Sequence, residues 1–402
     1  MQVRLRRLER GICCHHVMPV NARGKFAPCS TLALSLSQRK IPSLDGLRAV
    51  AVTLVIFHHL KVPFAPEGRG VLTFFVLSGF LITWMMLNES EKNDSISIRN
   101  FYVRRTLRIF PAFYVYLAVA FAAKWLTQGW PSGSTLSDYL SAFTYTSNYR
   151  FALTPRVDHA CWHTWALSIE EQFYLLWPWF LAAFQKDLRK LTHLLIAAIV
   201  LVDVYRMVLF FKFHVDDHWL SYTFDSRADH LLVGCLLAVL LKRGVLMRFW
   251  NLLTGRVSIS LLSFGLIALS IVLAYRFHLR YKFAVGFVVD PLLTAIFLVQ
   301  VIAMGETWIW GWLNWRVVRY VGQVSYGMFL YHMMVNRLVI DLFGHHSLWV
   351  HVPAVMAGSA LLGACSFHIV EMRFLRLKSR LTRNSTNRSE ATLAPDYQLA
   401  NS

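Results

Sequence analysis

Long apolar stretches recur along the chain, separated by short polar segments. Most run for about 17 residues or more, which is enough for a helix to cross the hydrocarbon core of a bilayer, and the sixth is short. The pattern predicts ten such helices, at about residues 44–60, 70–87, 109–127, 170–184, 191–211, 229–241, 257–275, 283–304, 317–341 and 351–371. We therefore expect an all-α, polytopic integral membrane bundle.

The composition agrees with a membrane protein. Hydrophobic residues make up 56% of the chain, and its mean hydropathy of +0.45 does not suit an ordinary soluble globule. Residues 1–40 hold eight Lys or Arg and a single acid, Glu9. We expect one transmembrane domain over 41–378, with 1–40 as a basic, unstructured cytoplasmic extension and 379–402 as a disordered cytoplasmic tail.

The net charge of +19 reflects membrane topology and not a nucleic-acid partner. Basic residues gather at span ends in alternate loops, as cytoplasmic loops do. An even number of spans, ten, then places both termini in the cytoplasm, and we expect the chain in the inner (plasma) membrane of the cell. The basic loop 276–282 is an exception to this charge rule, because the topology places it outside. The six cysteines lack zinc-ligand spacing, so no metal site is expected.

Arg48 and His59 form the first candidate site. They are eleven positions apart, about three helical turns or 16 Å, so they share one helix face, whereas His58 points about 100° away. Ionisable residues inside a membrane helix usually face a protein interior and mark function. The alternative is that Arg48 reaches the interface and His59 only ends the helix.

Two charged clusters stand at other span ends. Arg104, Arg105 and Arg108 share a helical side, which fits either a phosphate clamp or simple positive-inside anchoring. Glu170 and Glu171 begin the fourth span. Acidic residues at this position either stabilise the helix through its dipole or take part in catalysis.

Small and polar residues in the other spans complete the candidates. The Ser78-Gly79 pair predicts close helix packing, with or without a substrate contact. The predicted topology places His59 and Glu170 near the outer face, and Arg48 with the arginine cluster near the inner face. The remaining candidates are Arg227, Asp229, Ser325, Tyr326 and His332.

These motifs together resemble the membrane-bound acyltransferase family 3, which includes O-acetyltransferases of bacterial surface polysaccharides. The resemblance covers about residues 41–378. It rests on the Arg-x10-His pattern of Arg48 and His59, and on the runs Phe74–Phe80, Arg104–Pro111, Trp165–Tyr174, Arg227–Gly234 and Ser325–His332. The sequence departs from the family pattern at Leu72, Thr73, Ala166 and Arg373.

The resemblance implies an enzyme that moves an acyl group, expected to be acetyl, from cytoplasmic acyl-CoA to a hydroxyl. The acceptor would be a sugar, a glycan or a lipid-linked saccharide at the outer face, and no cofactor would be bound permanently. It implies His59 as the base, Glu170 as the group that orients it, Arg48 as a third catalytic residue, and Arg104, Arg105 and Arg108 as ligands of CoA. Substrate contacts would come from Ser78, Arg227, Asp229, Ser325, Tyr326 and His332.

Three other functions remain open at this point. A family member could acylate a small secondary metabolite instead of a glycan. A secondary transporter would also hold charges at mid-membrane, but it should show two related halves or matching broken helices, and neither is visible. A non-catalytic membrane scaffold would not need His59.

Overall fold

The computed structural model describes residues 41–154, 157–344 and 347–377, and this part of the chain is helical without strands. The predicted extension 1–40 and tail 379–402 lie outside the described residues. Helices occur near all ten predicted positions: α3 (Pro42–His59), α4 (Arg69–Asn93), α5 (Ile98–Gln128), α8 (Thr164–Phe184), α9 (Leu188–Phe211), α11 (Phe224–Lys242), α13 (Val257–Tyr281), α14 (Phe287–Met304), α15 (Arg316–Phe343) and α16 (Leu348–Ser366).

Shorter elements join the long helices. They are α6 (Gly133–Phe143), α7 (Ser147–Leu153), α10 (Asp217–Tyr222), α12 (Trp250–Thr254), η1 (Val245–Phe249), η2 (Lys282–Gly286), η3 (Gly311–Asn314) and η4 (Phe367–Glu371). The last of these continues α16, and η2 joins α13 to α14.

Five helical segments in the described chain are long and apolar enough to cross a membrane. They are Arg69–Asn93, Ile98–Gln128, Leu188–Phe211, Val257–Met304 and Leu348–Leu377. This identifies a membrane protein, while the number of crossings and the side of each terminus stay predictions. Helices α3, α8, α11 and α15, which also carry candidate residues, contain charged side chains and are not among these five segments.

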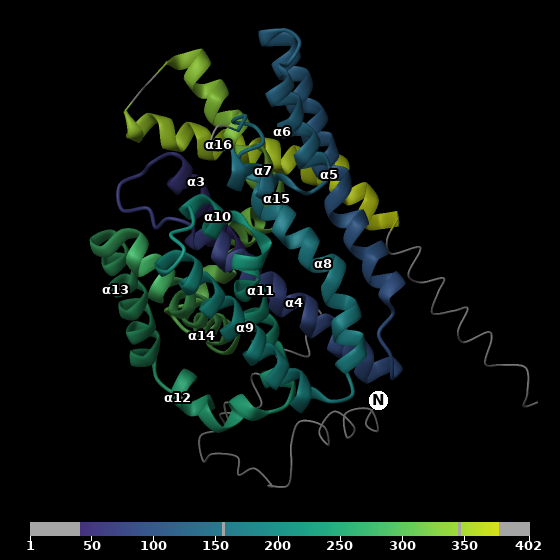
Figure 1. Cartoon of the computed structure of the whole chain (residues 1–402), viewed down its shortest axis with the longest axis vertical. Helices are drawn as coiled ribbons and strands as arrows, with labels where there is room; N and C mark the ends of the chain where they lie inside the picture. Colours follow the sequence, from purple (N-terminus) through teal and green to yellow (C-terminus); the bar gives the residue numbers. More distant parts are fainter. Residues whose placement is uncertain (1–40, 155–156, 345–346, 378–402) are drawn as a thin grey trace, which may run out of the picture.

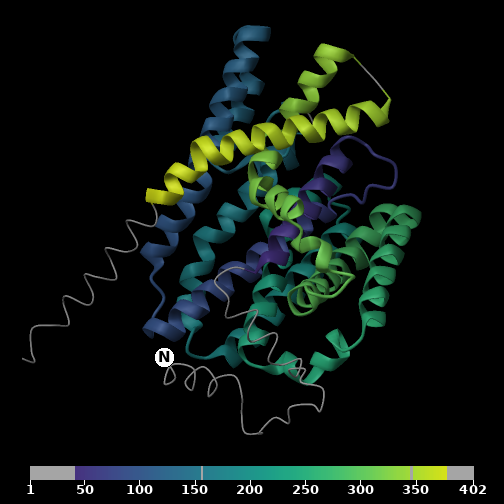
Figure 2. The ribbon, with the colours of Figure 1, turned by 180° about the vertical axis from the view of Figure 1, so that it is seen from behind.

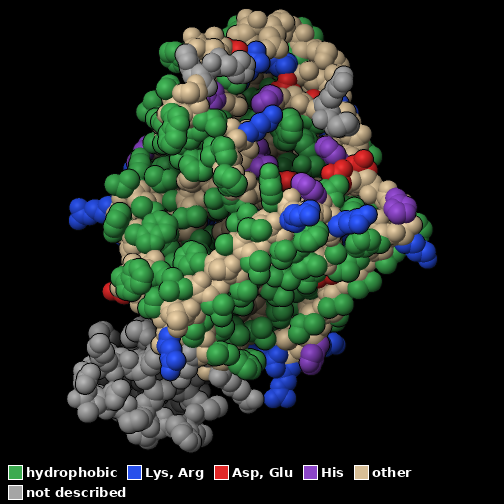
Figure 3. Space-filling model, turned by 90° about the vertical axis from the view of Figure 1, so that its left-hand side faces the viewer, with side chains coloured by type: hydrophobic (Ala, Val, Ile, Leu, Met, Phe, Trp, Pro, Cys, Tyr) green, Lys and Arg blue, Asp and Glu red, His purple; other side chains and the backbone are tan. Residues whose placement is uncertain are grey.

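Apolar helices surround the charged ones. The apolar stretches of α9, of α13 with α14, and of α16 are each only 17% buried, whereas that of α4 is 72% buried. Among the most extensive contacts are those of α4 with α11 and of α3 with α15. In Figure 1, α3 and α4 run through the middle with α13 at one side, and Figure 2 shows α16 crossing the back. Hydrophobic side chains cover most of one flank (Figure 3), as lipid contact requires.

Two glycines bring α4 and α11 together. A Cβ added at Gly79 would collide with the backbone oxygen of Leu231, and one added at Gly234 would collide with that of Val76. At these two positions the backbones of α4 and α11 are so close that a side chain larger than that of glycine does not fit between them. The packing role predicted for Ser78-Gly79 is confirmed.

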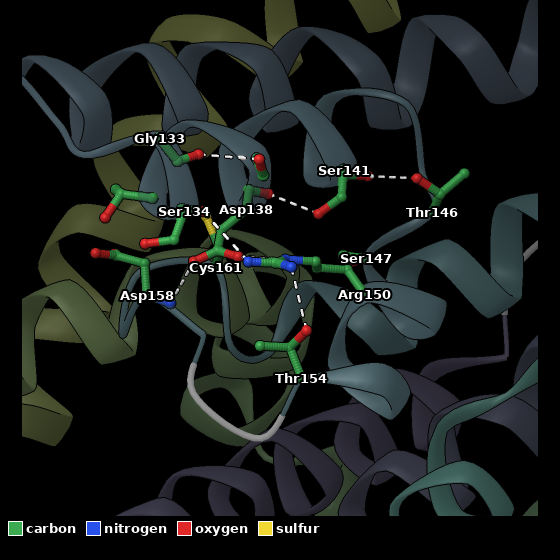
Figure 4. A network of polar contacts seen from close by, with 12 residues as sticks. Gly133, Ser134, Asp138, Ser141, Thr146, Ser147, Arg150, Thr154, Asp158 and Cys161 are labelled. Carbon is green, nitrogen blue, oxygen red and sulfur yellow. Dashed lines mark hydrogen bonds and ion pairs between the residues drawn. The ribbon is translucent and has the colours of Figure 1, made fainter.

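A polar network holds the segment that leads into α8 (Figure 4). The Asp138 carboxylate accepts a hydrogen bond from Arg150 Nε at 2.8 Å and another from the backbone N–H of Asp158 at 2.9 Å. Arg150 also donates to Thr154 at 3.1 Å. These bonds tie α6 and α7 to the loop before His163, so they help to place that residue.

We predict that Gly79→Ala destabilises the bundle, because the added methyl group has no space against the α11 backbone. Overpacking of this kind costs about 1–3 kcal/mol. Gly265→Ala, on α13 with open space around it, is the matched control. The midpoint of thermal unfolding of both purified proteins is the measurement. Equal midpoints would show that the α4–α11 contact does not need glycine.

Candidate active site

One cavity of about 690 Å³ opens beside the end of α3. We call it the histidine cavity, because His58, His59 and His163 line it together with Arg227 and Phe329. Its volume lies within the range of about 300–1,000 Å³ that small-molecule sites occupy. The sequence places His58 on a different face of the helix from His59. Both residues nevertheless line this cavity, because it extends around the end of α3.

A chain of hydrogen bonds determines the protonation of His59. His332 Nδ1 lies 2.6 Å from the carbonyl oxygen of Phe329, and His59 Nδ1 lies 2.7 Å from His332 Nε2. A carbonyl oxygen can only accept, so His332 Nδ1 donates to it, and the neutral His332 ring then accepts at Nε2. His59 must therefore donate through Nδ1. Its Nε2 is left with a free lone pair, which is what a general base requires.

His163 is a buried histidine that the sequence analysis did not select. It immediately precedes α8, and its ring centroid lies 5.0 Å from that of His332 and 5.2 Å from that of Phe329. Neither of its ring nitrogens has a hydrogen-bond partner in the described part of the chain. The only signal in the sequence was its position two residues before Trp165.

A second cavity, of about 820 Å³, contains most of the predicted cationic residues. We call it the arginine cavity, because Arg48, Arg105 and Arg108 line it. Arg105 lies over the ring of Tyr174, 3.7 Å from its centroid, and 3.9 Å from the carboxylate of Glu170. Within the described residues, Arg48 and Arg108 have no carboxylate at ion-pairing distance. Three carboxylates also line the cavity, those of Asp45, Glu170 and Glu371. None of them lies at ion-pairing distance from Arg48 or Arg108, so these two guanidinium groups can bind an anion.

Arg104 does not line this cavity. Its guanidinium forms an ion pair of 2.6 Å with Glu89 of α4, which draws it away from Arg105 and Arg108. The helical spacing predicts that the three arginines share one side of α5. It cannot predict that Glu89 of the neighbouring helix α4 pairs with Arg104. The placement does not support Arg104 as a ligand of CoA.

Glu170 lies in the arginine cavity, so the expected contact with His59 is absent. Its carboxylate accepts a hydrogen bond of 2.8 Å from Ser78. The hydrogen-bond partner of His59 is His332 instead. The proposed orientation of His59 by Glu170 is therefore wrong: α8 carries Glu170 nearly two turns beyond the level of His163.

The other predicted substrate residues are dispersed. Ser78, Ser325 and Tyr326 line the arginine cavity, and Arg227 lines the histidine cavity. Asp229 and His332 line neither cavity: Asp229 is buried and paired with Arg206 at 2.9 Å, and His332 supports His59.

The two cavities are neighbours: Val71 and Phe329 line both. Helix α3 runs alongside them, with Arg48 in the arginine cavity and His59 in the histidine cavity. The residues of the Arg-x10-His pattern therefore mark two compartments. A base in one compartment and unpaired cations in the next suit an enzyme that transfers a group between two substrates.

Comparison with known proteins identifies the family. The model of acyltransferase family 3, described as an acyltransferase domain, matches residues 41–368. The chain belongs to this family.

Similar proteins carry O-acetyltransferase names. The peptidoglycan O-acetyltransferase OatA of Listeria monocytogenes is 30% identical over 363 residues, which is 87% of this chain and 57% of the relative. YrhL of Bacillus subtilis, provisionally named a peptidoglycan O-acetyltransferase, is 29% identical over 83% of this chain and 54% of its own. The chain thus spans a little over half the length of these relatives. No solved structure matches it.

We predict that His332→Ala lowers kcat by about 10²- to 10⁴-fold while the KM for acyl-CoA stays unchanged, since His59 loses the group that fixes its tautomer. His332→Gln should recover part of the loss, because its amide oxygen can accept from His59. Acyl transfer by purified protein is the measurement, with the exposed His193→Ala as control. Full activity of His332→Ala would remove the hydrogen-bond chain from catalysis.

Proposed function

We propose that the protein transfers an acetyl group from acetyl-CoA, bound in the arginine cavity, to a sugar hydroxyl in the histidine cavity. The observation that carries this proposal is that the two cavities are neighbours whose linings share Val71 and Phe329. A donor in one cavity and an acceptor in the other could react there without sharing a binding site.

The charges of the arginine cavity support a phosphate-bearing donor. Guanidinium groups form charge-assisted, often bidentate bonds with phosphate. Arg105 is held by the Tyr174 ring and by Glu170, which in turn is held by Ser78. In this account Glu170 is a positioning residue for the donor site and does not act on His59.

His59 supplies the proton chemistry. Its Nε2 takes the proton from the acceptor hydroxyl as that oxygen bonds to the thioester carbonyl carbon. The carbon–sulfur bond then breaks, and the proton passes from His59 to the departing CoA thiolate. His332 accepts from Nδ1 throughout and so stabilises the imidazolium that forms in between.

A saccharide acceptor suits the walls of the histidine cavity. Trp162, Trp165 and Tyr222 line it, and aromatic faces with nearby polar groups are suited to sugar rings. The peptidoglycan named for one relative is a glycan of the cell surface. We therefore propose a glycan or lipid-linked saccharide acceptor at the outer face of the plasma membrane, with acetyl-CoA supplied from the cytoplasm.

The test replaces the arginines of the donor site. Arg105→Gln combined with Arg108→Gln should raise the KM for acetyl-CoA by about 10²- to 10⁴-fold, since each lost charged hydrogen bond costs about 1.5–3 kcal/mol. The KM for the acceptor should hardly change. The assay follows labelled acetyl appearing as an alkali-labile ester on a saccharide, in liposomes that contain the purified protein.

Arg104→Gln is the matched control, because it removes an arginine of the same helix that is paired with Glu89 outside the cavity. A rise in KM equal to that of the double variant would mean that general charge, and not the cavity, attracts the donor. An unchanged KM in the double variant would place the donor elsewhere.

A further inference from the structure

Three cationic side chains line the histidine cavity, and two are neutralised within it. Arg69 forms an ion pair of 2.9 Å with Asp290, and Lys282 forms one of 3.1 Å with Glu67. The Lys282 ammonium lowers the pKa of the Glu67 carboxyl, so Glu67 stays ionised and keeps that charge balanced. Arg227 has no such partner in the part of the chain that the structure describes.

The acid closest to Arg227 in the sequence is already occupied. Asp229 lies two positions along α11, but one of its oxygens is bonded to Arg206 at 2.9 Å and the other to His230 at 2.7 Å. Arg206 is also paired with Asp203. This buried network sits beside the cavity without neutralising Arg227 through direct contact.

Aromatic rings hold Arg227 in place. Its guanidinium carbon lies 4.3 Å from the ring centroid of Phe287 and 5.9 Å from those of Phe75 and Trp165. Such contacts stabilise a cation but leave its charge in place. Arg227 is only 4% exposed, and its Nε has no hydrogen-bond partner among the described residues.

An unpaired guanidinium buried against rings is costly unless an anion compensates it. The surplus negative charge of Asp203 and Asp229 over Arg206 acts on Arg227 only at a distance, so its guanidinium keeps free donors. An anion can reach these donors from the cavity that Arg227 lines, which is also the cavity of His59. Guanidinium binds carboxylate and phosphate groups through two parallel hydrogen bonds, so either could serve.

We propose that Arg227 binds an anionic group of the acceptor, a carboxylate or a phosphate, while a hydroxyl of the same molecule meets His59. This inference rests on the acyl-transfer function proposed above and makes the acceptor an acidic saccharide. Arg227 thereby determines acceptor specificity, and the proton transfer remains with His59.

The test compares three small acceptors that differ at C6, which is uncharged in methyl β-glucoside, a carboxylate in methyl β-glucuronide and a phosphate ester in methyl β-glucoside 6-phosphate. Wild-type protein in nanodiscs should bind at least one acidic acceptor about 10- to 100-fold more tightly than the neutral one, and kcat/KM for acetyl transfer should follow. Preference for the glucuronide indicates a carboxylate ligand, and preference for the 6-phosphate indicates a phosphate.

Arg227→Gln should abolish this preference and leave binding of the neutral acceptor and of acetyl-CoA unchanged. Arg227→Lys should keep part of the preference for an acidic acceptor, because it keeps the positive charge. That result would show that the loss in Arg227→Gln does not come from misfolding. The control replaces a complete ion pair of the same cavity, Arg69→Gln with Asp290→Asn, and so leaves the net charge unaltered. That double variant should retain the preference.

Equal binding of all three acceptors by the wild type would overturn the inference, as would an undiminished preference in Arg227→Gln. Because binding is read without turnover, these outcomes are separate from failure of the proposed function, which would appear as no acetyl transfer from acetyl-CoA to any of the three acceptors.

Discussion

The cost of exposing charge to hydrocarbon organises this protein. Helix α3 carries Arg48 near one end and His59 at the other, and neither can face lipid cheaply. The helix therefore lies at the centre, packed against α4 and α15, while strongly apolar helices such as α9 and α13 take the periphery. Enclosing these polar groups creates interior cavities, and the same requirement that buries the charges produces the site.

The two cavities in that interior differ in chemistry because their walls come largely from different helices. Around Arg48 the walls come from α5 and its arginines, with Glu170 as a partial counterion. Around His59 the walls come mainly from α3, α4 and α13. His332 and the Phe329 carbonyl, both on α15, fix the base. Phe329 lines both cavities, so one residue supports the base and borders both compartments.

Much of the fold could be predicted from sequence, because a helix that crosses a membrane must be long and apolar within its own residues. Which helices pack against one another could not be predicted from the sequence. Spacing identified Arg48 and His59, yet Glu89 capturing Arg104, and His332 replacing Glu170 beside His59, depend on which helices become neighbours. His163 was missed for the same reason: only its approach to His332 and Phe329 in space makes it notable.

The most direct test of a divided donor and acceptor site is a cryo-electron microscopy structure with a non-hydrolysable acetyl-CoA analogue. The account predicts phosphates against Arg105 and Arg108, and the acetyl end at Phe329, facing His59. An analogue lying in the histidine cavity, with its phosphates on Arg227 and the arginine cavity empty, would contradict it.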